Sequence, residues 1–484
     1  MAGLLAAIRL EQEGEEYVVL EKAEHLGGTW RDNRYPGLTC DVPAHAYTYN
    51  FEPYAEWQAY YATGAEVQTY FERTAEKHGV LPRIRFGAEV TACTWDEAGQ
   101  AWRIELSSGE RLTAEVVVAA TGVLHHPRMP EIEGAASFAG TALHSARWHE
   151  NVPLDGKRVG VIGNGSTGVQ IVTALAGRAA HLVHFQRSPQ WIMPVPQFPY
   201  SDEQREAFRR DPALIDAIRF DPDYWNAIHR FTRAITEPEG DDIAAIEAIC
   251  LDNLEKSVRD PVLREKLRPD YRVACKRLIY SWCYYDAVQA PGVEVERGAI
   301  ARIEPEGVRL DDGRLVAADT LVFATGFHAD RFIRPTTVKG RDGRLLDDVW
   351  AVRPTAYYAV ALPGFPNFFM LNGPTGPVGN FSLIDIAERQ WGYIERLLEE
   401  LRCGRATAIE PRQSALDDYE TRRIAAAHRT IFGSGCSSWY LDATGVPATW
   451  PWSYEAFADA MANPRFEDFD FNRQQGFQEE EPTR

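Results

Sequence analysis

Periodic and alternating apolar positions divide the chain into helices and strands in a recurring order. An amphipathic pattern predicts a helix from Met1 to Gly14, followed by an apolar strand at 17–20. Further along, residues 158–162 form a second apolar strand, which opens into a glycine-rich loop and a helix over 169–177. Alternation of strands with helices in this way is typical of α/β proteins with a parallel sheet.

Two stretches of the chain repeat the same order of elements. Residues 88–112 alternate as a three-stranded meander and lead into an apolar strand at 116–120, which runs into a Thr-Gly pair. Residues 293–315 predict a second meander, followed by a strand at 320–324 that also runs into Thr-Gly. The duplication predicts an α/β protein with two Rossmann-like dinucleotide-binding domains of the three-layer ββα type, and therefore two bound nucleotides.

The same pattern predicts the extent of each part. The first dinucleotide domain comprises residues 1–150 and is completed by 326–466, while 151–325 form the second domain. A helical insertion at about 202–267 interrupts the second domain and covers a substrate cavity or acts as a structural lid. The polar, acidic tail at 467–484 is expected to be disordered.

A Gly-x-Gly-x-x-Gly loop follows the strand at 158–162. Set between a strand and a helix, such a loop lets the backbone approach a pyrophosphate, which the helix N-terminus then binds. The candidate residues are Gly163, Asn164, Gly165, Ser166, Thr167 and Gly168. The next strand ends at Arg187-Ser188 in place of an acid, which favours the 2′-phosphate of NADP over NAD. The alternative is an exposed arginine at a strand end.

The first half contains only part of a second dinucleotide unit. Glu21 ends a strand 18 residues after Gly3, close to the spacing at which a carboxylate meets a ribose hydroxyl. Gly3 would be the third glycine of a loop whose earlier part precedes Met1, so the chain is expected to start late. The alternative is an ordinary N-terminal helix without a ligand.

Composition excludes several classes of binding partner. The net charge of −19 over 484 residues argues against nucleic acid and anionic membrane, and no apolar run is long enough for a membrane span. The seven cysteines form no CxxC and no metal-ligand spacing, so no metal site is expected. An odd, scattered set predicts reduced thiols in a cytoplasmic protein.

Two longer motifs carry a resemblance to a known family. Residues 27–41 read G-G-x-W-x-x-x-x-Y-P-G-x-x-x-D, and Phe138, Gly140, His144 and Trp148 read F-x-G-x-x-x-H-x-x-x-W. In both, the chain resembles the type I Baeyer–Villiger monooxygenases, although His149 stands where that family has Pro or Asp. His144 and Trp148 are interpreted as linkers between domains.

The resemblance implies a flavoprotein that uses FAD and NADPH. Such enzymes insert one atom of O2 next to a ketone carbonyl through a C4a-peroxyflavin and release an ester or lactone. The resemblance makes Arg277 the cation that stabilises negative oxygen and Asp41 the carboxylate that orients it. The alternative for Lys276-Arg277 is a solvated basic pair.

The resemblance also assigns cofactor-binding residues. Those for FAD are Gly3, Glu21, Gly28, Thr29, Trp30, Asp41, Tyr47, Val90, Asn380 and Phe381. Those for NADP, beyond the glycine loop, are Arg187, Ser188, Lys276, Arg277 and Trp439, of which the last could equally be a packing residue.

Three other functions stay open at this point. A monooxygenase acting on nitrogen or sulfur would not need Asp41 or Arg277. A pyridine-nucleotide disulfide reductase shares the two-nucleotide layout but needs a CxxC that this chain lacks. A degenerate nucleotide-binding protein without FAD would explain the missing first strand. Steroids, cyclic ketones and aryl ketones are all candidate substrates.

Overall fold

A five-stranded parallel sheet forms the centre of one half of the molecule. The computed structural model describes residues 1–149, 151–377 and 381–472. The strand order is β12-β9-β8-β16-β7, and every neighbouring pair is parallel. Its strands are β7 (Thr141–His144), β8 (Arg158–Ile162), β9 (His181–Gln186), β12 (Val293–Arg297) and β16 (Thr320–Phe323).

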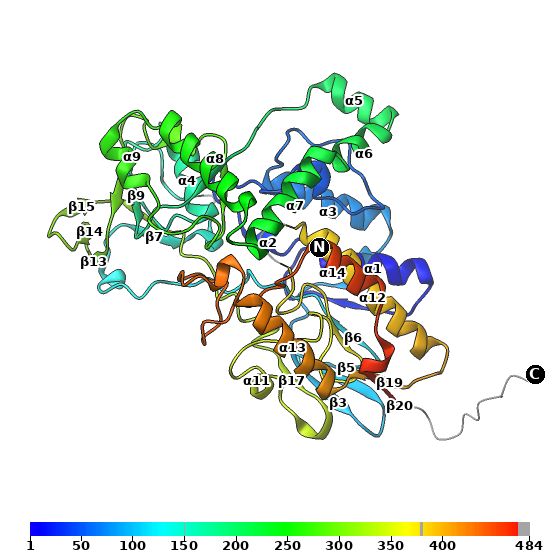
Figure 1. Cartoon of the computed structure of the whole chain (residues 1–484). Helices are drawn as coiled ribbons and strands as arrows, with labels where there is room; N and C mark the ends of the chain where they lie inside the picture. Colours follow the sequence, from blue (N-terminus) through cyan, green and yellow to red (C-terminus); the bar gives the residue numbers. More distant parts are fainter. Residues whose placement is uncertain (150, 378–380, 473–484) are drawn as a thin grey trace, which may run out of the picture.

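The two faces of this sheet are covered differently (Figure 1). Helix α4 (Ser166–Leu175) packs on one face, where Val159 and Val161 of β8 join its apolar side. The antiparallel meander β13 (Ile300–Glu304), β14 (Gly307–Leu310) and β15 (Leu315–Ala317) packs on the other face, against Ile162. Alternate residues of one strand therefore serve two cores, which gives the three layers that the sequence predicts.

The other half contains the N-terminal elements and most of the C-terminal ones. Helix α1 (Ala2–Glu13) ends at Gly14, whose φ of 74° is left-handed, as expected of a helix stop. The four-stranded sheet runs β17-β3-β4-β5, and two short parallel pairs, β1-β2 and β18-β6, form separate sheets. The bounds are β1 Val19–Leu20, β2 Ile84–Arg85, β3 Val90–Asp96, β4 Ala101–Leu106, β5 Arg111–Ala114, β6 Val117–Ala119, β17 Thr337–Lys339 and β18 Phe368–Met370.

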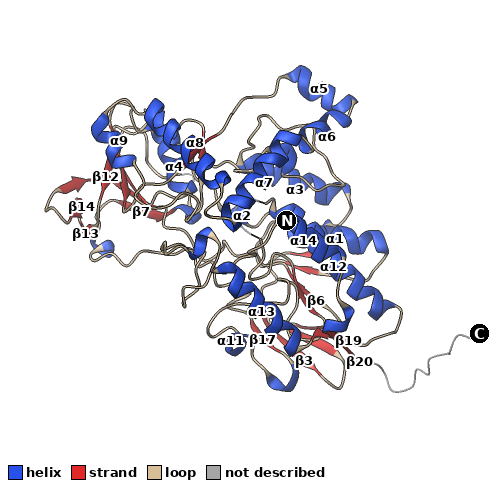
Figure 2. Ribbon diagram, in the orientation of Figure 1, coloured by secondary structure: helices blue, strands red, loops and turns tan. Residues whose placement is uncertain are grey.

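Helices surround these sheets (Figure 2). The predicted insertion consists of helices joined by short connections, and Figure 1 shows α5 and α6 reaching across to the side of α3. The insertion contains α5 Asp202–Arg210, α6 Ala213–Arg219, α7 Pro222–Thr236, α8 Asp241–Ser257 and α9 Pro261–Leu267. The remaining helices are α2 Thr29–Asp32, α3 Gly64–Lys77, α10 Tyr284–Ala287, α11 Leu346–Val349, α12 Leu383–Arg402, α13 Gln413–Ala427 and α14 Tyr454–Ala462. Two further short pairs are β10 Ile192–Pro194 with β11 Ile279–Ser281, and β19 Ala408–Pro411 with β20 Phe469–Asn472.

The structure differs from the sequence-based prediction at strand β12 and at residues 469–472. Strand β12 was predicted as part of the second meander, but it extends the central sheet by pairing with β9. Its adjacent residues Val295 and Glu296, which point to opposite faces of the sheet, are both buried. Residues 469–472 were assigned to a disordered tail, but they pair with β19 because Phe469 and Phe471 alternate toward a core. Residues 473–484 lie outside the described part of the chain.

The cysteine prediction was wrong for one pair. Cys275 and Cys436 are joined by a disulfide across 161 residues of sequence. Their Cα atoms are 6.0 Å apart, within the range that a disulfide requires. The free cysteines are Cys40, Cys93, Cys250, Cys283 and Cys403, of which the first three are buried. In the described residues no helix is long and apolar enough to cross a membrane.

Candidate active site

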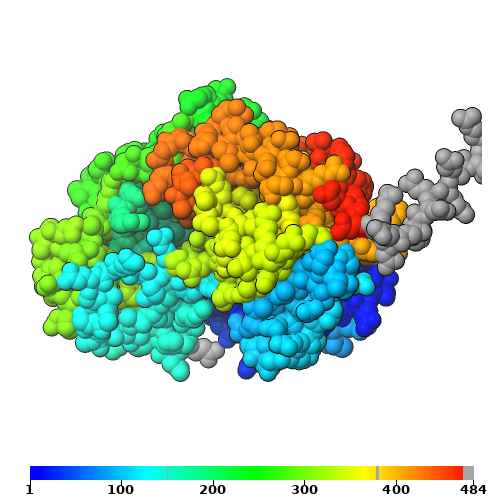
Figure 3. Space-filling view, turned by 90° about the horizontal axis from the view of Figure 1, so that it is seen from below, coloured from blue at the N-terminus to red at the C-terminus, as the bar shows by residue number. Residues whose placement is uncertain are grey.

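A cleft with a volume of about 2360 Å3 runs between the carboxyl ends of the central sheet and the loops around α1 and α2. Pockets for a single drug-sized ligand measure roughly 300–1,000 Å3, so this cleft has room for more than one large molecule. Figure 3 shows from below how the orange C-terminal part lies against the green part of the chain. The predicted residues that line the cleft are Gly28, Thr29, Trp30, Asp41, Tyr47, Gly163, Asn164, Gly165, Ser166, Thr167, Arg187, Ser188, Lys276, Arg277, Phe381 and Trp439.

Four predicted residues do not line this cleft. Gly3 lies inside α1, and Gly168 lies one turn inside α4. The carboxylate of Glu21 accepts from the Ala23 N–H and lies 3.2 Å from the Arg31 guanidinium. The backbone carbonyl of Val90 accepts a hydrogen bond from the Thr336 hydroxyl.

One further prediction, Asn380, lies outside the described residues. Its neighbour Phe381 is buried and packs against the ring of Tyr454, with 4.9 Å between ring centroids.

The glycine loop after β8 is shaped by close backbone contacts. A Cβ on Gly168 would lie 1.9 Å from the carbonyl oxygen of Gly163, so α4 packs onto the loop only with glycine there. A Cβ on Gly165 would meet no atom within 4 Å, because this residue faces the open cleft. The loop therefore offers backbone N–H groups to a ligand at the start of α4, the geometry that a pyrophosphate requires.

The buried side chain of His184 contacts the backbone of this loop, a role that the sequence did not indicate. Its Nε2 lies 3.1 Å from the Gly163 carbonyl oxygen, and its Nδ1 lies 3.0 Å from the Tyr284 hydroxyl. Since the carbonyl only accepts, Nε2 carries the proton and Nδ1 accepts from the tyrosine. Burial lowers the pKa of His184 to about 4, so the ring is neutral. The residue lies mid-strand in β9, where no local motif distinguishes it from packing.

Two cations converge where β9 ends. Lys276 Nζ donates to Ser188 Oγ over 3.0 Å and lies 4.0 Å from the ring centroid of Tyr271. Burial lowers the pKa of Lys276, Arg187 lowers it further, and Asp270 acts in the opposite direction. Cations placed this closely in a cleft favour a ligand with concentrated negative charge, such as a phosphate.

Arg277 and Asp41 meet inside the cleft. Arg277 Nη2 lies 2.5 Å from Asp41 Oδ2, and the two side chains are 29% and 25% exposed. The carboxylate raises the pKa of Arg277 above its already high ordinary value, so the guanidinium remains charged. Arg277 is therefore paired within the cleft with a residue far away in the sequence, which favours the predicted role over a solvated basic pair.

Tyr440 is a second partner of Arg277 that the sequence analysis did not identify. Tyr440 lines the same cleft as Arg277, close enough for the charge of the guanidinium to act on it, and is only 2% exposed. Burial raises the pKa of Tyr440, and the charge of Arg277 acts against that rise. Its neighbour Trp439 is 47% exposed and lies at the cleft, with ring centroids 4.2 Å apart. The adjacency of Tyr440 to Trp439 was the one signal available in the sequence.

The opposite wall of the cleft fits a second nucleotide. A Cβ on Gly28 would meet nothing within 4 Å, and its φ of 55° is left-handed, so the backbone there is open to a ligand. Trp30 Nε1 donates to the Tyr47 hydroxyl over 3.3 Å, which fixes the indole at the cleft wall. A flat ring system and a pyrophosphate can therefore be held between aromatic side chains and open backbone. Within the described residues no three His, Cys, Asp or Glu side chains are grouped to hold a metal.

Comparisons with known proteins agree with this geometry. Residues 1–201 match a family described as pyridine nucleotide-disulphide oxidoreductase. The chain is 43% identical over 455 residues to an uncharacterized monooxygenase of Mycobacterium tuberculosis, covering 94% of this chain and 91% of that protein. It is 38% identical over 453 residues to a Baeyer–Villiger monooxygenase of Streptomyces coelicolor, covering 93% and 86%.

Solved structures give the same result. Cyclohexanone monooxygenase from Rhodococcus sp. Phi1 bound to NADP+ superposes with a TM-score of 0.86 at 29% identity, covering 98% of this chain and 97% of the other. OTEMO in complex with FAD and NADP superposes with a TM-score of 0.86 at 27% identity, covering 97% of each chain. Sequence identity over most of both lengths, a shared fold and the matching motifs lead to one conclusion: the chain belongs to the type I Baeyer–Villiger monooxygenase family.

Proposed function

We propose that this protein uses FAD and NADPH to insert one oxygen atom of O2 next to a ketone carbonyl, giving an ester or lactone. Residues 1–150 and 326–466 hold FAD, and residues 151–325 hold NADP. The observation that carries the proposal is the Arg277–Asp41 pair, a permanent cation held by a carboxylate in a cleft large enough for both cofactors.

The cofactor supplies the difficult step, and the chain supplies fixed charge. When bound, FAD reduced by NADPH would supply the activation of O2. Arg277 stabilises the negative charge that develops on the carbonyl oxygen of the ketone, without a proton that it could lose. Asp41 holds the guanidinium in place, because an unpaired charge in a partly buried site is costly.

The neighbouring groups orient the nicotinamide nucleotide. Lys276, Ser188 and Arg187 bind the 2′-phosphate, and the loop at Gly163–Gly168 binds the pyrophosphate. Trp439 covers the nucleotide at the mouth of the cleft. On the other side, open backbone at Gly28 and the fixed indole of Trp30 hold FAD.

Product analysis tests this function. Purified protein reconstituted with FAD is mixed with NADPH and a panel of cyclic, aryl and steroid ketones, with an organic sulfide and a tertiary amine alongside. We expect flavin absorbance in the purified protein and an ester or lactone product from at least one ketone. Oxygenation of the sulfide or amine alone would favour the N- or S-oxygenating alternative. A colourless protein that cannot be reconstituted would favour a degenerate nucleotide-binding protein.

A further inference from the structure

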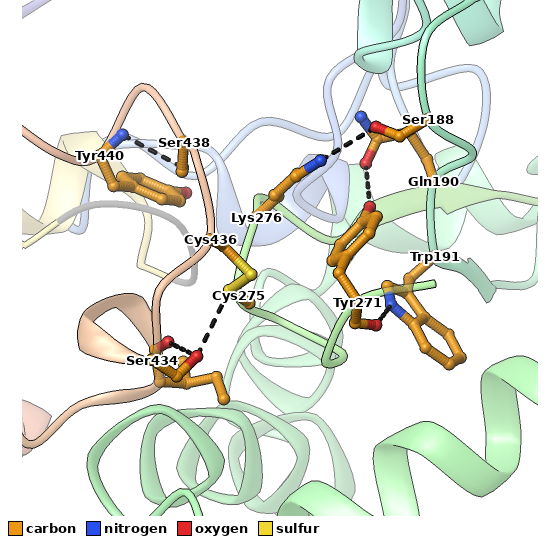
Figure 4. The surroundings of a disulfide bond; sticks show 11 residues. Ser188, Gln190, Trp191, Tyr271, Cys275, Lys276, Ser434, Cys436, Ser438 and Tyr440 are labelled. Carbon is orange, nitrogen blue, oxygen red and sulfur yellow. Dashed lines mark hydrogen bonds between the residues drawn. A yellow bond between two sulfur atoms is a disulfide. The ribbon is translucent and has the colours of Figure 1, made fainter. Parts of the chain in front are cut away.

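The disulfide joins two segments that both line the cleft (Figure 4). Cys275 directly precedes Lys276 and Arg277. Cys436 belongs to residues 434–442, here called the C-terminal strap, which also carries Trp439 and Tyr440. The bond thus fixes the strap to the segment whose two cations are assigned to the nucleotide phosphate and the reacting oxygen.

Other contacts fix the Cys275 segment and the C-terminal end of the strap, but few fix the part of the strap around Cys436. Figure 4 shows that Lys276 bonds to Ser188 and that the Tyr271 hydroxyl donates to Gln190 over 2.8 Å, so the Cys275 segment is anchored to the loop after β9. The strap is more exposed. Tyr440 is buried and packs at 4.4 Å between ring centroids against Phe432, and the Asp442 carboxylate lies 3.2 Å from Arg353 Nε. Residues 434–439 are exposed or half-buried.

The two sulfurs differ in access. Cys275 is fully buried, and Cys436 is half-buried in a strap with exposed neighbours on both sides. Small reagents therefore reach Cys436 first. Segments with few buried contacts open at low free energy, so the covalent bond is the strongest link between residues 434–439 and the Cys275 segment.

We propose that Cys275 and Cys436 form a reversible thiol–disulfide site that controls the C-terminal strap and, through it, the release of NADP+. This inference rests on the proposed binding of NADP in the cleft. In the oxidised protein the strap keeps Tyr440 against Arg277 and Trp439 over the nucleotide. In the reduced protein the strap opens more often, and NADP+ leaves faster.

The oxidant is a hydroperoxide, and the reductant is a dithiol. The Cys436 thiolate attacks one oxygen of hydrogen peroxide and breaks the O–O bond, which gives a sulfenic acid and, with one proton, water. The Cys275 thiol then displaces the sulfenic oxygen as a second water and forms the S–S bond. Overall, two thiols and one peroxide give one disulfide and two waters. A dithiol reverses the change and becomes a disulfide itself.

The test compares oxidised and reduced full-length protein loaded with FAD. Under denaturing conditions we expect five titratable thiols after peroxide treatment and seven after dithiothreitol. Stopped-flow fluorescence should show NADP+ release about tenfold slower from the oxidised form, which would be about 1.4 kcal/mol in the barrier. Chymotrypsin should cut the strap after Trp439 or Tyr440 faster in the reduced form. In Cys436→Ser both differences should vanish, and in the matched control Cys403→Ser, an exposed cysteine, both should remain.

Two results would overturn the proposal. One is the absence of a linked Cys275–Cys436 peptide after peroxide treatment. The other is equal chymotryptic cleavage of the strap in oxidised and reduced wild-type protein, a comparison that needs neither a variant nor NADP+. Failure of NADP+ binding in both forms would instead count against the proposed function, so the two failures are distinguishable.

Discussion

Replacing Asp41 with asparagine removes the charge that orients Arg277 while keeping the shape of the side chain. The structure places Arg277 Nη2 and Asp41 Oδ2 2.5 Å apart, a charge-assisted hydrogen bond. Hydrogen bonds to charged groups contribute about 1.5–3 kcal/mol, and the partial exposure of both side chains places this one near the middle of that range. A loss of about 2 kcal/mol of transition-state stabilisation corresponds to a roughly 30-fold lower kcat/KM.

The assay is ketone-dependent product formation under NADPH, measured by gas chromatography and normalised to bound FAD. Asp155→Asn is the matched control, because Asp155 forms an exposed ion pair with Arg178, at 2.9 Å, outside the cleft. Surface pairs of this kind contribute about 0–1 kcal/mol, and the control should leave kcat/KM within about twofold. An Asp41→Asn protein with wild-type kcat/KM would refute the view that this carboxylate orients the guanidinium.

Three further outcomes follow from the nucleotide site. Arg187→Ala should raise the Kd of NADP+ about tenfold and leave that of NAD+ unchanged, as titration calorimetry would show, because only NADP+ has a phosphate for this cation. Gly168→Ala should lower the free energy of unfolding by about 1–3 kcal/mol, since its Cβ would meet the Gly163 carbonyl at 1.9 Å. Gly165→Ala adds its Cβ to open space, so this control variant should unfold at the wild-type temperature when both variants are heated in a thermal unfolding experiment. Because burial lowers the pKa of His184 to about 4, the unfolded chain binds this proton first. The free energy of unfolding should therefore fall as the pH drops from about 6.5 toward 4. In urea titrations over the same pH range, the free energy of unfolding of His184→Gln should fall less steeply.

Helices with a regular apolar periodicity or a capping residue could be predicted from local sequence. Helix α12 is amphipathic over its full length, Leu383–Arg402, so its periodic apolar positions are visible in the sequence alone. The insertion at 202–267 was likewise clear, because Ser201 caps its first helix and Asp260 its last. Strands that form by pairing with a distant part of the chain could not be predicted in this way. Strand β20 pairs with β19, and nothing near Phe469 in the sequence indicates that partner.

The same contrast holds for the site. The glycine loop and the Gly27–Asp41 motif are contiguous, so their cleft-lining residues could be named from the sequence. The roles of His184, Tyr440 and the Cys275–Cys436 bond depend on partners 21 to 163 residues away in the sequence. These partners come together only when the chain folds. Cysteine spacing in particular does not determine a pairing.

The positive charge of Arg277 is the group on which the proposed oxygen insertion depends most. Its most direct test is the rate of NADPH-dependent ester or lactone formation by Arg277→Ala, measured per bound FAD beside wild-type protein. Removing a preorganised donor for a developing oxyanion lowers kcat by roughly 100- to 1,000-fold, and we predict a loss of that size in a protein that still binds FAD. Ester formation at the wild-type rate in this variant would contradict the central claim.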